Sequence, residues 1–374
     1  MTMGKQVGIL SMQKVINYGS YLQAFALKQL LLRNGADKVD FIDIIRGRSL
    51  KGFESCGFKY ALRRMCSMFK VILQGRANAK RKTMAYRAAL RDTIMGQWSY
   101  LGIKEGPDQS GHYDLAVIGS DEVFHCCQAS EWGYTTQLYG NIPQAKEVVS
   151  YAGSFGATKL GDLKQQGVDN EIGENLKRLK SISVRDGNSF EIVRRLTGII
   201  PNKHIDPVLA YGFEKEIDSS PTVDESNYIL VYSYPDRINK SKEVKAICEF
   251  AKSQGKKLIC VMSRYDWCDR AIIPTPLELL SWFKNADMVV TETFHGTIFS
   301  IISRRQFVTI GRETSMPKLT SMLSPYGLED RLLKSPDDIS RLFSTVIDYD
   351  NVFKKLNELR IDTNEYLKSC LRDA

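Results

Sequence analysis

Short apolar runs alternate along the chain with segments whose apolar residues recur every three or four positions. The apolar runs predict buried strands, and in the first half of the chain they lie at Val7–Ser11, Val39–Ile44, Leu115–Ile118, Glu147–Tyr151 and Ser181–Val184. Helical spacing follows the first strand, with Ser20 as the predicted N-cap and Asn34-Gly35 as the predicted end, and it returns around Glu171–Leu179. Such alternation indicates a parallel sheet covered on both faces.

The same pattern starts again after the polar stretch Glu214–Glu225, which contains Ser219-Ser220-Pro221. Strands are predicted at Tyr228–Tyr232, Lys257–Met262, Met288–Thr291 and Phe307–Ile310, and helices at Lys240–Gln254, Leu277–Asn285 and Gly296–Ser303. We therefore predict an α/β protein with two doubly wound, Rossmann-like domains that face a cleft, over residues 1–212 and 213–350. A helix is predicted over 351–374. Packing of this helix against the N-terminal domain is one arrangement that we consider.

Length and composition narrow the class of protein. The 374 residues fit two domains, and 43% hydrophobic with 25% charged residues are ordinary for a soluble enzyme. No apolar run reaches the roughly 18–20 residues that span a bilayer, and the N-terminus lacks the features of a signal peptide. None of the eight cysteines forms a CxxC pair. We expect a cytoplasmic protein whose site needs no metal and no cofactor.

The excess of basic residues, 52 Lys and Arg against 43 Asp and Glu, is partly local. From Lys59 to Arg91 basic and apolar residues are interleaved without an acidic residue, which predicts a basic helical insertion near 55–97. Such a helix suits an anionic membrane surface, at the inner face of the membrane, or a solvated insertion packed on the domain. Nucleic acid is not an expected partner, because no recognition motif accompanies the charge.

One histidine stands at the junction of a predicted strand and a predicted helix. His295 follows the apolar run Met288-Val289-Val290 closely, and the helix is predicted to begin at Gly296. Helix N-termini attract anions, and an imidazole beside an anion site is a candidate acid or base. The alternative is a hydrogen-bonded histidine that closes the helix.

Four other polar stretches follow predicted strands, at the edge where parallel sheets bind ligands. They are Asn17-Tyr18-Gly19-Ser20, Gly119-Ser120-Asp121-Glu122-Val123, Ser150–Gly156 and Ser183-Val184-Arg185-Asp186. Asn17 suits a phosphate, a sugar hydroxyl or a helix cap. Asp121 suits the orientation of a hydroxyl or a basic side chain, or a helix cap. The planar guanidinium of Arg185 suits a carboxylate, a phosphate or a structural ion pair. No Walker A sequence, nucleophile elbow or GxGxxG fingerprint is present.

Together these motifs resemble the polysaccharide pyruvyl transferase family, which attaches pyruvate from phosphoenolpyruvate to a sugar as a cyclic ketal. The resemblance rests on the order and spacing of Asn17-Tyr18-Gly19 with Leu22-Gln23-Ala24, Gly119-Ser120-Asp121-Glu122-Val123, Ser150-Tyr151-Ala152-Gly153-Ser154-Phe155-Gly156, Ser183-Val184-Arg185, Asp206-Pro207 and Phe294-His295-Gly296-Thr297. It implies a glycosyltransferase-B-like fold without a metal requirement. It also implies that Arg185 and His295 correspond to the family's donor-binding arginine and active-site histidine.

The chain departs from the family pattern at two positions. Some members carry arginine two residues before the histidine, where this chain has Thr293, and glutamine is common where it has Glu122. The missing arginine leaves the charge of phosphoenolpyruvate less covered, and Lys318 and Arg312 are the basic residues that could compensate.

The resemblance and the residues lead to one predicted function with two alternatives. We predict a pyruvyl transferase that uses phosphoenolpyruvate and a saccharide acceptor, lipid-linked saccharides included, in the synthesis of a cell-surface or capsular polysaccharide. The candidate catalytic residues are His295 and Asp121, and the candidate substrate-binding residues are Arg185, Lys318, Asn17, Tyr18, Ser120, Ser154, Thr293, Gly296 and Thr297. The alternatives are a nucleotide-sugar glycosyltransferase of the same fold and a non-catalytic saccharide- or phosphate-binding protein.

Overall fold

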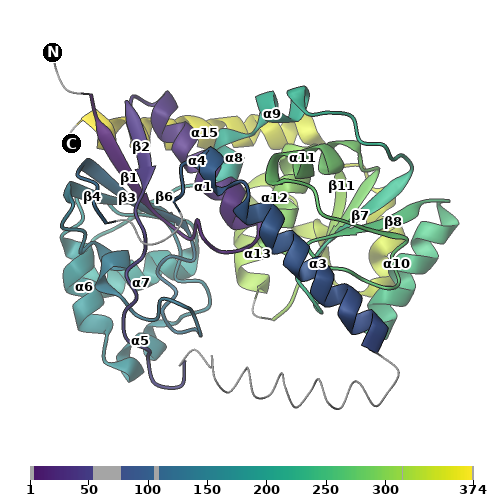
Figure 1. The fold of residues 1–374 in the computed structure, drawn as a ribbon, viewed down its shortest axis with the longest axis horizontal. Helices are drawn as coiled ribbons and strands as arrows, with labels where there is room; N and C mark the ends of the chain where they lie inside the picture. The colour runs from purple at the N-terminus through teal and green to yellow at the C-terminus, as the bar shows by residue number, and fades with distance from the viewer. Residues whose placement is uncertain (1–3, 54–76, 105–108, 314, 373–374) are drawn as a thin grey trace.

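The computed structural model describes residues 4–53, 77–104, 109–313 and 315–372, and these form two parallel six-stranded sheets side by side (Figure 1). The first sheet has the order β2-β1-β3-β4-β5-β6, with β1 at Gln6–Leu10, β2 at Lys38–Phe41, β3 at Tyr113–Asp121, β4 at Ala145–Gly153, β5 at Ser183–Val184 and β6 at Asn202–Lys203. The second has the order β12-β11-β10-β7-β8-β9, with β7 at Tyr228–Tyr232, β8 at Lys257–Val261, β9 at Arg270–Ile272, β10 at Met288–Thr291, β11 at Gln306–Ile310 and β12 at Leu332–Leu333.

Helices cover both faces of the sheets, which confirms the predicted pair of doubly wound domains in a glycosyltransferase-B-like arrangement. The helices are α1 (Tyr18–Arg33), α3 (Ala77–Met95), α4 (Trp98–Leu101), α5 (Leu160–Gln166), α6 (Asp169–Lys177), α7 (Gly187–Thr197), α8 (Pro207–Tyr211), α9 (Glu214–Ser219), α10 (Ser241–Ser253), α11 (Pro276–Asn285), α12 (Phe294–Ile302), α13 (Met316–Leu323), α14 (Ile339–Ser344) and α15 (Tyr349–Arg372). Neighbouring residues of β3 belong to different cores: Val117 packs in the cluster that includes Leu22 of α1, and Ile118 in the cluster that includes Ile192 of α7. Because both faces of this strand are buried, its sequence contains one continuous apolar run.

Two helix starts differ from the prediction because side chains cap them earlier. α1 begins at Tyr18, since the Asn17 side chain, and not Ser20, is the N-cap and accepts the Ser20 amide at 2.7 Å. α12 begins at Phe294 rather than Gly296, since Thr293 Oγ1 accepts the Gly296 amide at 2.8 Å. His295 consequently lies within the first turn of the helix rather than before it.

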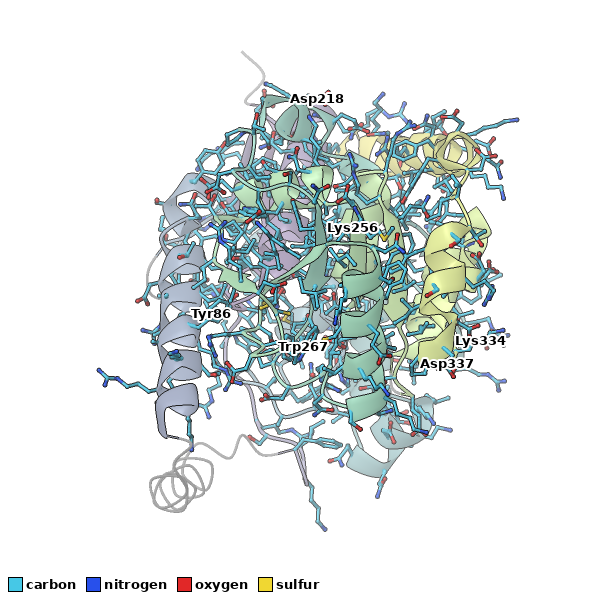
Figure 2. All side chains as sticks on the ribbon, turned by 90° about the vertical axis from the view of Figure 1, so that its right-hand side faces the viewer. Tyr86, Asp218, Lys256, Trp267, Lys334 and Asp337 are labelled. Atoms are coloured by element: carbon cyan, nitrogen blue, oxygen red, sulfur yellow. The ribbon has the colours of Figure 1, made fainter. Side chains whose placement is uncertain are left out.

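The predicted basic insertion near 55–97 falls partly on residues 54–76, which lie outside the described residues. Its described part contains α3, which crosses from the first domain to the second (Figure 1). Tyr86 on α3 points toward the second domain (Figure 2), where its hydroxyl donates to the Ile272 carbonyl at 2.8 Å. Arg87 forms an exposed ion pair with Asp236 at 3.1 Å. None of the described helices is long and apolar enough to cross a membrane.

The C-terminal helix α15 contacts both domains. Near its start, Asp350 pairs with Arg304 at 3.3 Å in the second domain. Near its end, the Tyr366 hydroxyl donates to the Ser150 carbonyl at 2.8 Å, and the Asn364 side chain accepts from Asn34 at 2.8 Å in the first domain. The helix thus ties the two sheets together, while the domain boundaries at 212 and 350 stay predictions.

Candidate active site

Each sheet reverses its strand order once, between β1 and β3 in the first domain and between β10 and β7 in the second. Ligands bind beside such switch points in open α/β sheets. Here two adjoining cavities of about 830 Å³ and about 560 Å³ are lined by residues that follow strands of both domains. Both cavities are lined by Glu122, Tyr234, Phe294 and Lys318, so they are two compartments of one cleft. We call the smaller the His295 compartment and the larger the Glu292 compartment, after a residue that lines each.

His295 is buried in the first turn of α12, with 5% of its surface exposed. Its Nε2 lies 3.7 Å from Asp206 Oδ2, too far for a hydrogen bond, and has no hydrogen-bond partner among the described residues. Its other ring nitrogen faces α1 of the first domain so closely that a Cβ at Gly19 would lie 2.3 Å from Nδ1. Glycine at position 19 therefore lets the imidazole reach the other domain, while Nε2 is buried beside Asp206.

Asp206 connects His295 with Arg185. Its Oδ1 caps α8 by accepting the Val208 amide at 3.0 Å, and its Oδ2 accepts from Arg185 Nη1 at 2.8 Å. Burial by itself would raise the pKa of Asp206, but His295, Arg185 and the Val208 amide together lower it to about 2. The carboxylate of Asp206 thus faces both the imidazole of His295 and the guanidinium of Arg185. Asp206 is not among the predicted site residues, although the motif Asp206-Pro207 supports the family resemblance.

Arg185 leaves the end of β5 and is almost entirely buried, with 7% of its side chain exposed. Besides Asp206, its guanidinium lies 3.8 Å from Asp121 and 4.3 Å from the centre of the Phe294 ring. Burial opposes the charge of Arg185, but the carboxylates of Asp206 and Asp121 raise its pKa. The structural ion pair is thus present, and the same side chain also lines the His295 compartment.

Asp121 has the backbone conformation that L-residues rarely adopt, with φ at 75°. Such a conformation costs of order 1–3 kcal/mol and concentrates at functional sites. It lets the carboxylate of Asp121 line the His295 compartment, where Ser20 Oγ donates to it at 3.2 Å. Asn17, the N-cap of α1, lines the same compartment and donates to Ser20 Oγ at 3.1 Å.

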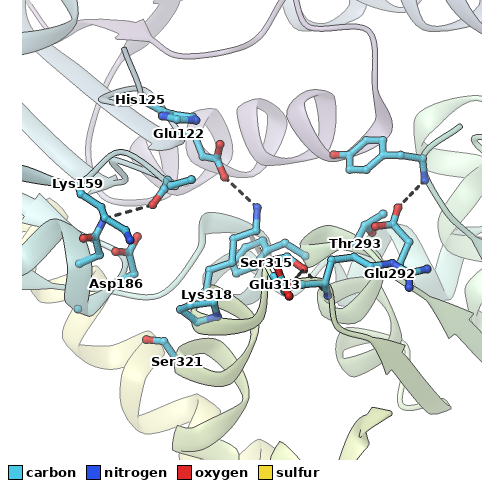
Figure 3. A pocket seen from close by; sticks show the side chains of 18 of the residues that line it. Glu122, His125, Lys159, Asp186, Glu292, Thr293, Glu313, Ser315, Lys318 and Ser321 are labelled. Atoms are coloured by element: carbon cyan, nitrogen blue, oxygen red, sulfur yellow. Dashed lines mark hydrogen bonds and ion pairs between the residues drawn. The ribbon is translucent and has the colours of Figure 1, made fainter. Parts of the chain in front are cut away.

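An ion pair between the domains separates the two compartments. Lys318 of α13 reaches Glu122 with an Nζ–Oε1 distance of 2.9 Å, in the middle of the cleft (Figure 3). Although burial opposes ionisation, Lys318 lowers the pKa of Glu122 below its usual range. His125 lines the Glu292 compartment beside this pair, with its Nδ1 at 2.6 Å from Thr158 Oγ1, and burial lowers the pKa of His125.

Five of the predicted site residues brace the backbone around the cleft and lie outside the linings of the two compartments. They are Tyr18, Ser120, Ser154, Gly296 and Thr297. The Tyr18 hydroxyl donates to the Pro274 carbonyl at 2.7 Å, Ser154 donates to Asp186 at 2.6 Å, and Ser120 accepts the Asp121 amide at 2.5 Å. Gly296 lies against Thr291, and the hydroxyls of Thr297 and Thr309 form a hydrogen bond at 2.9 Å. Thr293 caps α12 and lines the Glu292 compartment. Sequence reasoning missed Asp206, Tyr234, Phe294 and Glu292 as site residues.

The cleft combines charges of both signs with the imidazole of His295, whose Nε2 has no hydrogen-bond partner among the described residues. Arg185, Lys318 and the N-terminus of α12 suit an anion. His295 and the carboxylates suit proton transfer to and from a substrate. Among the described residues, no group of three or more His, Cys, Asp or Glu is arranged to hold a metal ion.

A model of the polysaccharide pyruvyl transferase family matches residues 17–314. No curated protein matches the chain. Similar solved structures include a putative UDP-N-acetylglucosamine 2-epimerase from Listeria monocytogenes, with 9% identity, 100% of this chain and 92% of that chain covered, and a TM-score of 0.49. A UDP-GlcNAc 2-epimerase from Neisseria meningitidis bound to UDP-GlcNAc has 8% identity, coverage of 98% and 94%, and a TM-score of 0.46.

Proposed function

Because the chain belongs to the polysaccharide pyruvyl transferase family, we propose that it transfers pyruvate from phosphoenolpyruvate to a saccharide as a cyclic ketal. One observation carries the proposal: His295, Arg185 and Lys318 line one compartment together with Asp121. The buried Asp206 contacts both His295, at 3.7 Å, and Arg185, at 2.8 Å. Both domains contribute to this group, so the cleft is the place where a donor and an acceptor can meet. The proposal includes a role in the synthesis of a cell-surface or capsular polysaccharide.

The donor binds in the His295 compartment. Phosphoenolpyruvate carries a carboxylate and a phosphate, and the cations Arg185 and Lys318 line this compartment beside α12, as does Lys14, which is paired with Asp43. A guanidinium has five N–H donors, and the hydrogen bond from Nη1 to Asp206 occupies one of them. In our proposal, donors of Arg185 that face the compartment bind the carboxylate of phosphoenolpyruvate.

The chemistry requires a proton at the methylene carbon and two hydroxyl additions at the neighbouring carbon. In our proposal His295 donates that proton from Nε2, and Asp206 stabilises the imidazolium from 3.7 Å. Asp121 orients a hydroxyl of the acceptor. Phosphate leaves between the two additions, and Lys318 offsets its negative charge.

Loss of the Arg185 guanidinium should weaken phosphoenolpyruvate binding more than tenfold. A charge-assisted hydrogen bond contributes about 1.5–3 kcal/mol. Arg185→Lys should restore the affinity only in part, because an ammonium lacks the planar pair of donors. Calorimetry on Arg185→Ala measures the loss, and Arg194→Ala on the exposed face of α7 serves as the control. Unchanged affinity in Arg185→Ala, at a temperature where that variant is folded, would reject the assignment.

A nucleotide-sugar glycosyltransferase is the second candidate, and one observation favours it. Glu292 is a buried carboxylate of the second domain that lines the Glu292 compartment, and a ribose-binding acid would be expected in that domain in such an enzyme. A thermal-shift screen with phosphoenolpyruvate, pyruvate and nucleotide sugars separates the two candidates. Stabilisation by a nucleotide sugar but not by phosphoenolpyruvate would favour the glycosyltransferase.

The acceptor in our proposal includes lipid-linked saccharides, with the protein at the inner face of the membrane. The unbroken positive charge of residues 59–91 supports this location. Co-sedimentation with liposomes should rise with anionic lipid and fall with salt, because salt screens surface charge. Replacing Arg81 and Lys82, both exposed on α3, by glutamine should reduce it. Equal partitioning to neutral vesicles, or none to either kind, would count against membrane contact.

A further inference from the structure

Glu292 is a buried carboxylate at the switch point of the second sheet. It follows β10, has 5% of its surface exposed and lines the Glu292 compartment. Its Oε1 accepts the amide of Tyr234, which follows the neighbouring strand β7, at 2.8 Å. Figure 3 shows this contact and the carboxylate beside Thr293. The hydrogen bond fixes one oxygen of the carboxylate, and the other oxygen is not part of it.

The charge of Glu292 is not neutralised by a direct ion pair among the residues that the structure describes. Arg237 and Arg312 act on it only from a distance, and Arg312 is held by Glu243 at 2.6 and 2.9 Å. Burial raises the pKa of Glu292, against the opposing effects of the Tyr234 amide and these arginines. A buried carboxylate without a counterion is costly, and such groups cluster at functional sites.

The lining of the Glu292 compartment suits a ligand rich in hydroxyl groups better than a polyanion. Four carboxylates line it, from Glu122, Asp186, Glu292 and Glu313. Four cations line it as well, from Lys159, Arg237, Arg312 and Lys318, and two of these are already paired, Arg312 with Glu243 and Lys318 with Glu122. Its polar uncharged side chains include those of Asn188, Ser315 and Ser321, and the rings of Tyr234 and Phe294 supply apolar faces. The volume of about 830 Å³ lies within the usual range for ligand cavities, about 300–1,000 Å³.

Glu292 and His295 belong to one short segment but serve different compartments. Phe294 stands between them in sequence and lines both compartments. We propose that the Glu292 compartment binds the acceptor saccharide and that Glu292 takes the proton from the hydroxyl that attacks the donor. The inference rests on the proposed transfer from phosphoenolpyruvate and adds the acceptor's location and its base.

The proton balance of the reaction supports the need for such a base. The acceptor gives up two hydroxyl protons, and the products gain one proton on the new methyl group and one on hydrogen phosphate. In the first addition, His295 protonates the methylene carbon while an acceptor oxygen bonds to the neighbouring carbon and its proton passes to Glu292. The carbon–oxygen bond to phosphate then breaks, and phosphate receives the proton from Glu292. The second hydroxyl closes the ketal and returns a proton to His295.

Glu292→Gln tests the role of the base, because the amide oxygen can still accept from Tyr234 while the side chain can no longer accept a proton. The probes are methyl hexopyranosides with free 4- and 6-hydroxyls, and the assay is phosphate release from phosphoenolpyruvate. We expect kcat to fall by a factor of roughly 10²–10⁴, with KM for the glycoside and the affinity for phosphoenolpyruvate changed less than about threefold. Glu249→Gln, an exposed carboxylate on α10, should match the wild type.

Ala157→Trp tests the location of the acceptor. Ala157 is exposed and lines the Glu292 compartment, so a tryptophan there should narrow the compartment without replacing a core residue. Saturation-transfer NMR should detect a methyl glycoside on the wild-type protein and on Glu292→Gln, and the signal should disappear in Ala157→Trp. Phosphoenolpyruvate affinity, measured by calorimetry on the same samples, should be retained.

Five results would overturn the inference. The first four are a kcat of Glu292→Gln within threefold of wild type, glycoside binding that survives Ala157→Trp, no glycoside signal on the wild-type protein, and displacement of the glycoside by UDP at equal concentration. Loss of phosphoenolpyruvate binding in Glu292→Gln would assign this residue to the donor instead and would also overturn it. Absence of phosphoenolpyruvate binding in the wild type would contradict the proposed function itself, so the two failures are distinguishable.

Discussion

Replacing His295 by asparagine should lower turnover by a factor of roughly 10²–10⁴, the usual contribution of a general acid, and leave the thermal midpoint nearly unchanged. Nε2 has no hydrogen-bond partner among the described residues, so the imidazole holds nothing in place through that atom. Asparagine fits within the volume of the ring but cannot supply a proton. The expected result is therefore a folded protein that binds phosphoenolpyruvate and does not convert it.

Turnover is measured as phosphate release with a working acceptor. Stability is measured by a thermal melt on the same preparation. His112→Asn is the matched control, because that histidine is exposed and precedes the start of β3, at the opposite end of this strand from Asp121. If His295→Asn unfolds, the histidine has a structural role. If it keeps near-wild-type turnover, another group supplies the proton.

Replacing Asp206 by asparagine should lower the free energy of unfolding by about 3–5 kcal/mol, the cost of leaving a buried ion without its partner. The variant keeps the shape of the side chain but removes the carboxylate that lies 2.8 Å from Arg185. The remaining ion pair of Arg185 among the described residues is the one with Asp121, at 3.8 Å. Urea denaturation at neutral pH measures the loss. Asp218→Asn, which removes an exposed carboxylate near Lys284, should change it little. A loss below about 1 kcal/mol would show that this ion pair adds little to stability.

The stability contributed by Asp206 should depend on pH in a definite direction. The pKa of Asp206 is lowered to about 2 from an ordinary value of 3.8. Its contribution to stability is therefore fully present above the unfolded value and is lost as the pH falls toward 2. The difference in stability between the wild type and Asp206→Asn should accordingly shrink as the pH falls below 3.8.

Much of the fold could be predicted because buried parallel strands leave an unmistakable pattern. Tyr228–Tyr232 and Met288–Thr291 are strands with the predicted bounds, since polar residues end each apolar run at once. The edge strand Asn202–Lys203 could not be predicted in this way, because both of its residues are exposed and polar. Helix starts were misplaced where a side chain of Asn or Thr caps the helix ahead of the apolar spacing.

The sequence could predict only those residues of the candidate site that directly follow a predicted strand. His295, Arg185 and Asp121 each follow an apolar run, and the topology brings all three to one compartment. The contact of Glu122 with Lys318 joins positions 196 residues apart, and no local pattern encodes it. Asp206 was missed for the same reason, because its partners come from a strand end and from the opposite domain.

The contact of Gly19 with the His295 ring has a further consequence for the timing of the reaction. The histidine belongs to one domain, while the helix and the carboxylate that face it belong to the other. A hinge motion that opened the cleft would separate His295 from both at once, and the acid would lose its counterion in the same movement. Ligands would then exchange with solvent only in the open cleft, and the donor would receive its proton only in the closed cleft. A donor that waits for its acceptor in the open cleft would not be protonated, and it would therefore be protected from hydrolysis.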